Sequence, residues 1–483
     1  MTNTLKTKSA IVRERLTHPV IDGDGHTVEN LPVVAEYMRE ICGPRIAEKY
    51  LASLPGGVRG WHGLSRQERR DMRIPRSGFW NYTNKAFDRA TVMLPNLFRE
   101  RLDDLGIDFA IVYGSLGEGF LRNPDDELRL AGARTLNTMN AEIFRPHADR
   151  MAAAAVIPMN TPEEAIDELE FAVKKLGMKV VALESCIRRP IAAIARKAPE
   201  AASYATFLDV LAHASEYDYD PVWRKCIELK VAATAHTGGR GWGARTSPES
   251  NIYNHIGHFA AAGEAFCKAL VIGGVVQRFP TLKFAFLEGG VGWASSLYND
   301  LISHWEKRNI QAMRENLDPA KLDLTLLTEL FAKYGGARFE TKGNGSTPAS
   351  LAPYTAERQE NPDDLDEWSA LKIESSRQFA EIFKNFFFGC EADDRMVATA
   401  FNPKQNRYGA RMQAMFSSDI GHWDVTDITA VVEEAHELVE DGLITEKDFR
   451  DFTFTNPVKL HASMNRDFFK GTVVEDVTNA IIA

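Results

Sequence analysis

The chain has few cysteines, no long apolar run and no excess of positive charge, and each absence excludes a class of protein. Its five cysteines are scattered and form no CxxC pair, which is typical of reduced thiols rather than of a disulfide framework. The longest apolar stretches, 152–158 and 269–276, are far shorter than the ~18 residues of a membrane span. The formal net charge of -10 argues against a nucleic-acid-binding surface. We expect a cytoplasmic protein that binds neither nucleic acid nor membrane.

Internal repeats and low-complexity tracts are also absent, and the rest of the composition is that of a globular protein. Hydrophobic residues make up 44% of the 483 positions and charged residues 26%, which excludes disordered, collagen-like and coiled-coil classes. The length suits one large domain with insertions, or two domains.

Eight short β-rich runs recur along the chain, and a helical pattern follows most of them. One such helix is expected between Asn160 and Gly177, where an N-cap residue, a proline in the first turn and a final glycine mark its limits. This alternation is the signature of parallel βα units, and eight of them predict an α/β fold, a (β/α)8 TIM-like barrel. The predicted strands are 19–24, 109–114, 151–158, 178–184, 230–236, 283–288, 385–390 and 412–419.

Three connections are too long for simple loops between strand and helix. They span about 30–105, 186–221 and 309–377, and we interpret them as insertions in a single barrel domain over 1–483. The polar, turn-rich stretch 341–366 in the third is expected to be a mobile flap, an arm that contacts a partner or a partly disordered loop, and a homodimer is predicted. Aromatic residues of the first insertion are predicted to wall the active site: Trp61, Phe79, Trp80 and Tyr82.

Side chains that can bind a metal follow several of the predicted strands. Asp24 and His26 alternate at the end of the first strand and therefore point to the same side. His236, Glu288 and Asp419 end the fifth, sixth and eighth strands. Because the carboxyl ends of all barrel strands meet on one face, these five side chains are expected to converge there.

This pattern resembles the amidohydrolase superfamily, and most closely its amidohydrolase-related branch, which includes aminocarboxymuconate-semialdehyde decarboxylase and the resorcylate-type decarboxylases. The stretch 270–293 is similar to that branch's sixth strand with the helix before it, and 416–424 is similar to the end of its eighth strand. The resemblance implies that His26 and His236 are metal ligands. It also implies that Asp419 is both a ligand and the carboxylate that handles the proton.

Three positions depart from the pattern of the superfamily. Asp24 and Glu288 stand where the superfamily has histidine, which makes the site harder and favours iron or manganese over zinc. Glu184 ends the fourth strand, where binuclear relatives have a bridging ligand, so the site is predicted to hold one or two divalent ions. The alternative is that Glu184 pairs with Arg188 or Arg189, which lie close by in the sequence.

Further polar and aromatic residues follow the strand ends and are candidates for binding the substrate. Arg188, Arg189 and Arg240 are predicted to bind an anionic group, with solvent-exposed charge as the alternative. His258, together with His255, is predicted to face the pocket, although a helix-surface role is common for such a pair. Trp242, Trp293 and Trp423 are expected to wall the pocket or to be buried in the core.

The leading hypothesis is a metal-dependent hydrolase with His236, Asp419 and His422 as the catalytic residues. Metal-activated water would attack an ester, thioester, amide or C–C bond of a small carboxylate-bearing or acyl substrate, with Asp419 taking the proton. One alternative is a metal-dependent nonoxidative decarboxylase of an aromatic or unsaturated acid. The other is a non-catalytic barrel that serves as a scaffold.

Overall fold

The computed structural model describes residues 6–59, 63–76, 83–318, 321–337 and 366–482. The chain divides into two compact units, one made of 1–298 with 380–483 and the other of 299–379. Trp61, Phe79, Trp80, Tyr82 and the stretch 341–365 lie outside the described residues, so their predicted roles stay predictions. The division into one barrel with three insertions also stays a prediction.

The first unit contains an eight-stranded parallel sheet in the order β1-β2-β3-β4-β7-β8-β9-β10. Each strand overlaps one of the eight predicted runs, so the predicted (β/α)8 barrel is confirmed. The strands are β1 Ile21–Thr27, β2 Phe109–Gly114, β3 Met151–Ile157, β4 Val180–Leu183, β7 Ala233–Ala235, β8 Phe284–Phe286, β9 Phe386–Cys390 and β10 Gln413–Phe416.

Backbone hydrogen bonds at the carboxyl ends of the first and last strands close the barrel. Asp419 N–H donates to the Asp24 carbonyl at 3.0 Å, and His26 N–H donates to the Ile420 carbonyl at 2.9 Å. Two segments almost 400 residues apart in sequence are therefore joined at one face, which is the face where barrel enzymes place their chemistry.

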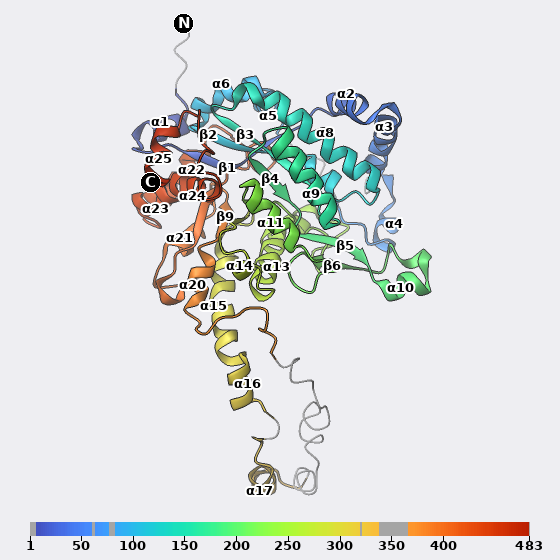
Figure 1. Ribbon diagram of the computed structural model, residues 1–483, viewed down its shortest axis with the longest axis vertical. Helices are drawn as coiled ribbons and strands as arrows, with labels where there is room; N and C mark the ends of the chain where they lie inside the picture. Colours follow the sequence, from blue (N-terminus) through green and yellow to red (C-terminus); the bar gives the residue numbers. More distant parts are fainter. Residues whose placement is uncertain (1–5, 60–62, 77–82, 319–320, 338–365, 483) are drawn as a thin grey trace. The chain divides into compact units, whose positions relative to one another are not determined.

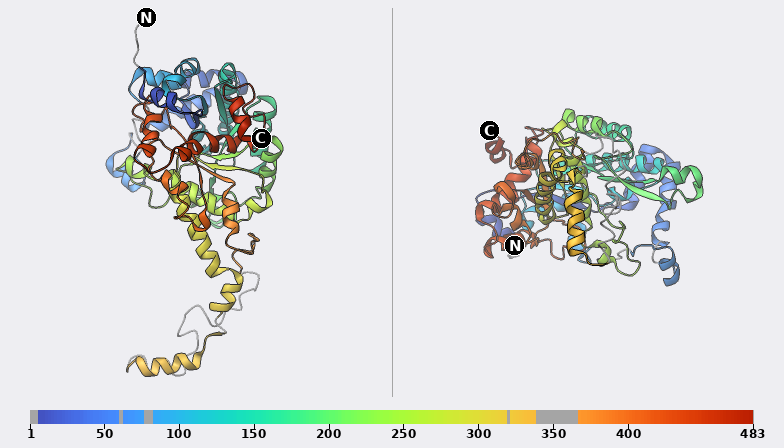
Figure 2. Two further views of the ribbon diagram at one scale, coloured as in Figure 1. Left: turned by 90° about the vertical axis from the view of Figure 1, so that its left-hand side faces the viewer. Right: turned by 90° about the horizontal axis from the view of Figure 1, so that it is seen from below.

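Helices surround the strands of the first unit, and α8, α9 and α11 lie side by side on one flank (Figures 1 and 2). The helices before β3 are α1 Lys8–Arg15, α2 Leu31–Cys42, α3 Pro44–Arg59, α4 Arg66–Asp71, α5 Ala86–Met93, α6 Pro95–Leu105, α7 Gly117–Leu121 and α8 Asp126–Phe144. Those from β3 to β9 are α9 Pro162–Glu170, α10 Ala192–Lys197, α11 Asp220–Leu229, α12 Asn251–His255, α13 His258–Ile272, α14 Val275–Arg278, α15 Gly292–Arg308 and α20 Gln378–Phe383. The last are α21 Val397–Phe401, α22 Val431–Glu440, α23 Glu446–Arg450, α24 Asn456–Ala462 and α25 Glu475–Ile482.

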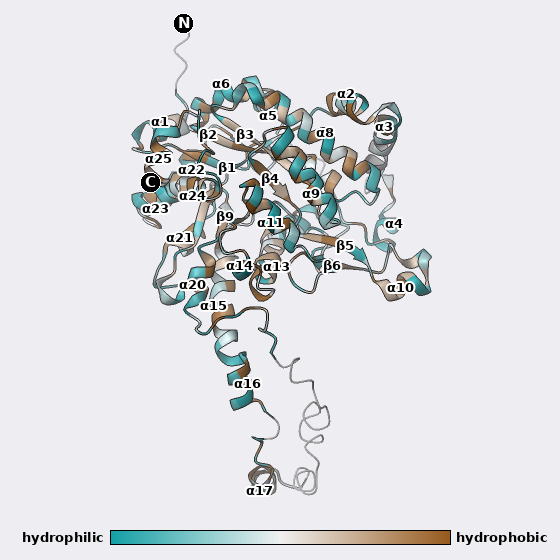
Figure 3. Cartoon of the chain, viewed as in Figure 1, coloured by the Kyte–Doolittle hydropathy of each residue, from teal (hydrophilic) through white to brown (hydrophobic). Residues whose placement is uncertain are grey.

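The apolar core fills the barrel and continues into the carboxyl-terminal segment. Figure 3 shows brown strands β3 and β4 beneath helices of mixed brown and teal. At the opposite end of the barrel from the closure, Phe468 and Phe469 pack on Phe109, the first residue of β2, with ring centroids 6.5 and 5.5 Å away. The same cluster includes Ile21 and Phe387. This apolar cluster fills the amino-terminal end of the barrel.

The long connections carry secondary structure of their own. Between β4 and α11, β5 Cys186–Pro190 and β6 Thr206–Val210 form an antiparallel hairpin that is separate from the barrel sheet. The second unit contains α16 Ile310–Asn316 and α17 Leu324–Tyr334. No helix in the described parts of the chain has both the length and the apolar character that crossing a membrane requires.

Candidate metal centre and active site

The predicted ligand residues lie at the carboxyl ends of their strands. Asp24 and His26 belong to β1, His236 follows β7 by one residue, Glu288 follows β8 by two, and Asp419 follows β10 by three. All five are almost completely buried. The strand ladder stops before the last three, which leaves their side chains in loops on the closed face.

The structure brings these side chains into one compact group. The ring of His26 lies 3.6 Å from Asp24 and 3.2 Å from Asp419. That of His236 lies 3.6 Å from Asp24 and 3.3 Å from Glu288. The donor atoms form two sets, and within each set all atoms lie within 4.8 Å of one another. The first set comes from Asp24, His26 and His236, and the second from His26, Glu288, Asp419 and His422. His26 belongs to both sets.

The donor set fits a divalent cation. Among the described residues, both carboxylate oxygens of Asp24 are buried and accept no hydrogen bond, a costly arrangement for a carboxylate unless a cation balances it. Burial raises the pKa of Asp24 to about 7 and lowers that of His26 to about 3. A cation would reverse the first effect, because it favours the charged form of the carboxylate. Imidazole and carboxylate donors together suit iron, manganese or zinc.

Two of the predicted ligand residues have strained backbones. Glu288 has a φ of 58° and Asp419 a φ of 51°, in the left-handed region that residues other than glycine rarely adopt. Such strain persists only where the surroundings enforce it, and it is concentrated at functional sites. Each of the two carboxylates lies beside a histidine, Glu288 beside His236 and Asp419 beside His26.

Asp22, which was not predicted from the sequence, links the first strand, β1, to the loop that follows the last strand, β10. Its carboxylate accepts from Ser418 N–H at 2.9 Å, from the Ser418 hydroxyl at 2.5 Å and from Asp24 N–H at 3.2 Å. It is fully buried. Asp22 thus fixes the backbone beside two predicted ligands, Asp24 and Asp419. The alternation of Asp22, Asp24 and His26 along one strand was the signal that could have identified it.

Asp419 and His422 form a close acid–imidazole pair. His422 Nδ1 lies 2.6 Å from Asp419, and its ring stacks on His26 with centroids 3.9 Å apart. Burial opposes both charges, but the mutual attraction outweighs it. The pKa of Asp419 is therefore held below its ordinary value and that of His422 above it. A proton can move within this pair without leaving the site.

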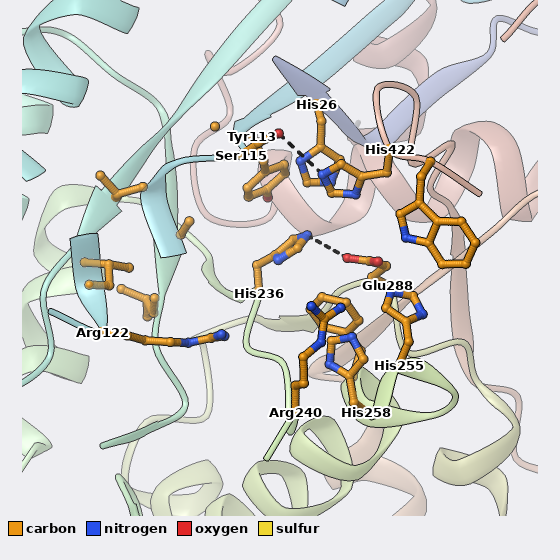
Figure 4. A pocket seen from close by; sticks show the side chains of 17 residues that line it. His26, Tyr113, Ser115, Arg122, His236, Arg240, His255, His258, Glu288 and His422 are labelled. Carbon is orange, nitrogen blue, oxygen red and sulfur yellow. Dashed lines mark hydrogen bonds and ion pairs between the residues drawn. The ribbon is translucent and has the colours of Figure 1, made fainter. Parts of the chain in front are cut away.

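A cavity of about 190 Å³ opens beside this cluster. Figure 4 shows Arg122 and Arg240 extending into it from separate segments, across from His26 and His422. His255 and His258, predicted to face the pocket, both line it. They belong to two helices, α12 and α13, with their rings 4.7 Å apart. Tyr113 of β2, Phe259 of α13 and Trp423 complete its aromatic lining.

Glu184 lies away from the two sets of donor atoms and contacts an arginine. Arg122 Nε is 3.3 Å from its carboxylate. The alternative partners inferred from the sequence are engaged elsewhere: Arg189 pairs with Asp209, and Arg188 donates to Thr206 at 3.1 Å. Arg122 was missed by sequence reasoning, since it follows the short helix α7 with no motif around it. Bridging of two metals by Glu184 stays a prediction.

The predicted tryptophans have different surroundings. Trp242 lines a second cavity next to the first. Trp293 packs on Phe286 and Phe388, with ring centroids 5.6 and 5.4 Å away, so packing against these two strand residues accounts for its burial. Its predicted role in substrate binding stays a prediction.

Comparisons with known proteins bear on the fold and on the predicted resemblance. Residues 124–320 match the family described as Amidohydrolase. Among solved structures the chain is similar to an amidohydrolase from Mycobacterium avium subsp. paratuberculosis, with 16% identity and a TM-score of 0.52 over 92% of this chain and 99% of that one. It is also similar to a dihydroxybenzoic acid decarboxylase from Polaromonas sp., solved with bound manganese, with 15% identity and a TM-score of 0.48 over 92% and 97% of the two chains.

At these identities a structural likeness supports the fold alone, and the first of the two supports the barrel. The sequence match covers less than half of the chain, from the residues before α8 to those after α16. The match confirms the resemblance predicted from the sequence, because residues 124–320 are similar to the amidohydrolase family.

Proposed function

We propose that the protein is a metal-dependent hydrolase of a small acyl or carboxylate-bearing substrate. The observation that carries this proposal is the position of the Asp419–His422 pair, 2.6 Å apart, at the edge of the donor cluster and beside the cavity that Arg122 and Arg240 line. Proton acceptor, metal ligands and cationic groups thus surround one space, as hydrolysis of a carbonyl substrate requires.

The residues would hold one divalent ion, or two if Glu184 bridges them, with Asp24, His26 and His236 as the first set of donors and Glu288 and Asp419 as further donors. The three carboxylates in this group favour iron or manganese over zinc. When bound, the ion supplies Lewis acidity and lowers the pKa of water.

The protein's own side chains perform the proton transfers and bind the substrate. Asp419 takes the proton of the attacking water and returns it to the leaving group, while His422 holds that carboxylate in place. Arg122 and Arg240 bind the anionic group of the substrate and balance negative charge that develops on its carbonyl oxygen. Tyr113, Phe259 and Trp423 shield the reacting bond from bulk water.

Nonoxidative decarboxylation is the second candidate, and one observation favours it. Glu184 contacts Arg122 at 3.3 Å and is not among the grouped donors, which suits a single metal ion. A mononuclear site can bind the carboxylate and a neighbouring oxygen of an aromatic acid, with Asp419 as the acid that protonates carbon.

One assay separates the two reactions. The purified protein is loaded with manganese, iron or zinc and offered aryl esters, thioesters, anilides and a panel of 2-hydroxybenzoates, while acid release and CO2 are both measured. Metal-dependent acid release that is lost in Asp419→Asn supports hydrolysis. The matched control is Asp476→Asn, at an exposed position of α25, which should retain full activity. CO2 release without acid release from esters would replace the proposal with the second candidate.

A further inference from the structure

A second cavity, larger than the first, lies next to the candidate active site. Its volume is about 530 Å³, against about 190 Å³ for the cavity at the metal cluster. Leu121, Arg122 and Arg240 line both, so the two spaces adjoin at these side chains. We call them the inner and the outer cavity.

Half of the residues that line the outer cavity belong to the long connection after β4. The β5–β6 hairpin contributes Ile187, Arg188 and Leu208, and the loop after β7 contributes Trp242. In Figure 4, Arg122 and Arg240 reach the inner cavity from the side away from His26 and His422. The outer cavity shares these two arginines with the inner one, and neither His26 nor His422 is among its lining residues.

The two volumes suit a substrate with two unequal parts. An apolar cavity of about 150 Å³ is enough for a benzene molecule, so the inner cavity admits a reacting group of about that size. The outer cavity has nearly three times that space, which lies in the range of sites for larger ligands. A substrate confined to the inner cavity would leave the outer one filled only with water.

The charges of the outer cavity indicate what that larger part carries. Three arginines line it, Arg122, Arg188 and Arg240, against a single carboxylate, that of Glu184. Ile187, Leu208 and Trp242 supply apolar surface between these charges. A net positive lining with apolar walls suits a chain or ring that ends in an anionic group such as a carboxylate or a phosphate.

We propose that the enzyme takes an elongated substrate: a small reacting group in the inner cavity, and a longer, partly apolar arm ending in an anion in the outer cavity. This inference rests on the proposed function for the reacting end only. Arg188 binds the terminal anion, and Leu208 contacts the arm.

Four 4-nitrophenyl esters test the proposal with the manganese-loaded enzyme: the acetate, the octanoate, the suberate monoester with its terminal carboxylate, and the 8-phosphonooctanoate. We expect kcat/KM to rise from acetate to octanoate and again, by about tenfold, with a terminal anion. The two anionic esters distinguish carboxylate from phosphonate recognition. No gain with length or with charge would overturn the proposal.

Two variants with matched controls localise the effect. Leu208→Trp fills the outer cavity and should lower kcat/KM for the three long esters at least tenfold while leaving the acetate within twofold; the control is Phe207→Trp on the same strand. Arg188→Ala should reduce the anionic esters to the level of the octanoate; the control is Arg196→Ala on the exposed helix α10. Equal losses on all esters in Leu208→Trp would contradict the outer cavity as a substrate site.

Binding measurements keep this test independent of catalysis. Isothermal titration with suberate, 8-phosphonooctanoate and octanoate should show tighter binding of the two dianions, and this preference should be lost in Arg188→Ala. If the esters are not hydrolysed but the preference is present, the proposed function fails while the elongated site stands. If hydrolysis of the acetate is present and the preference is absent, the reverse holds.

Discussion

Replacing Asp22 should weaken both the fold and the metal centre, because one carboxylate holds three donors at the barrel closure. Asp22→Ala leaves two buried backbone N–H groups, those of Asp24 and Ser418, without an acceptor. The Ser418 hydroxyl also loses its partner, although it can rotate. At about 1–3 kcal/mol for each buried donor left unsatisfied, we expect a loss of about 4 kcal/mol in the free energy of unfolding. That is a large part of the ~5–15 kcal/mol of a typical domain.

Asp22→Asn provides the graded comparison. Its amide oxygen still accepts from the two backbone N–H groups, and the Ser418 hydroxyl can rotate to accept from the amide nitrogen. We therefore expect a loss of only about 1 kcal/mol. Urea unfolding followed by circular dichroism measures both variants, with the exposed Asp476→Asn as the control.

Manganese affinity gives the second measurement on the same proteins. Asp22 fixes the backbone of Asp24, and it also holds Ser418, the residue that precedes Asp419. Asp22→Ala should therefore weaken manganese binding by about 10- to 100-fold. This account of the closure would be refuted if Asp22→Ala bound manganese normally and its free energy of unfolding lay within about 1 kcal/mol of that of the wild type, as is usual for surface changes.

Four further predictions concern proton transfer, the metal, the bridging of two metal ions by Glu184 and stability in acid. His422→Gln should lower kcat about 100-fold at unchanged metal content, and an unchanged kcat would exclude His422 from proton transfer. Chelation of the metal should lower the melting temperature and abolish activity, and re-addition of manganese should restore both. Glu184→Ala should leave the metal content unchanged and raise KM by releasing Arg122, whereas a fall from two ions to one would establish the bridge. Burial lowers the pKa of His461 to about 3, so its contribution to stability falls by about 1.4 kcal/mol for each pH unit below 6.5. His461→Phe should remove that slope between pH 6.5 and 4.5, and parallel curves would contradict it.

Much of the fold could be predicted because each strand and helix of the barrel has its own local sequence pattern. The helix expected between Asn160 and Gly177 is present as α9, followed by a π-helical turn over 171–175, and Gly177 has the positive φ of 77° that ends it. Six of the eight strands were predicted longer than they are, whereas β2 has its predicted bounds and β1 extends three residues further than predicted. The run 230–236 contributes only the three residues Ala233–Ala235 to the ladder. At its start, Lys230 caps α11 in the left-handed conformation and Val231 N–H donates to the Cys226 carbonyl, and at its end His236 lies beyond the ladder and faces the inner cavity.

The pairs that complete the site could not be predicted in the same way. Arg122 meets Glu184 across 62 positions of the chain, and Asp22 meets Ser418 across 396. Such contacts depend on how the barrel closes and not on any local period. The placement of His255 and His258 could be predicted in part. Both were expected to face the pocket, but their spacing suggested that they lie on one helix. Gly257 at a φ of 70° instead separates two helices and turns both rings into the inner cavity.

The strain at Glu288 and Asp419 and the link at Asp22 have one physical explanation. A left-handed backbone costs roughly 1–3 kcal/mol at a residue other than glycine, and a relaxed loop would turn each carboxylate away from the histidines. The hydrogen bonds between Asp22 and Ser418, and from Asp419 N–H to the Asp24 carbonyl, offset that cost at the Asp419 turn by tying it to β1. The donor atoms of Asp24 and His26 are therefore already in place before a cation binds, so little free energy is lost in rearranging them. The barrel closure is therefore part of the predicted metal centre.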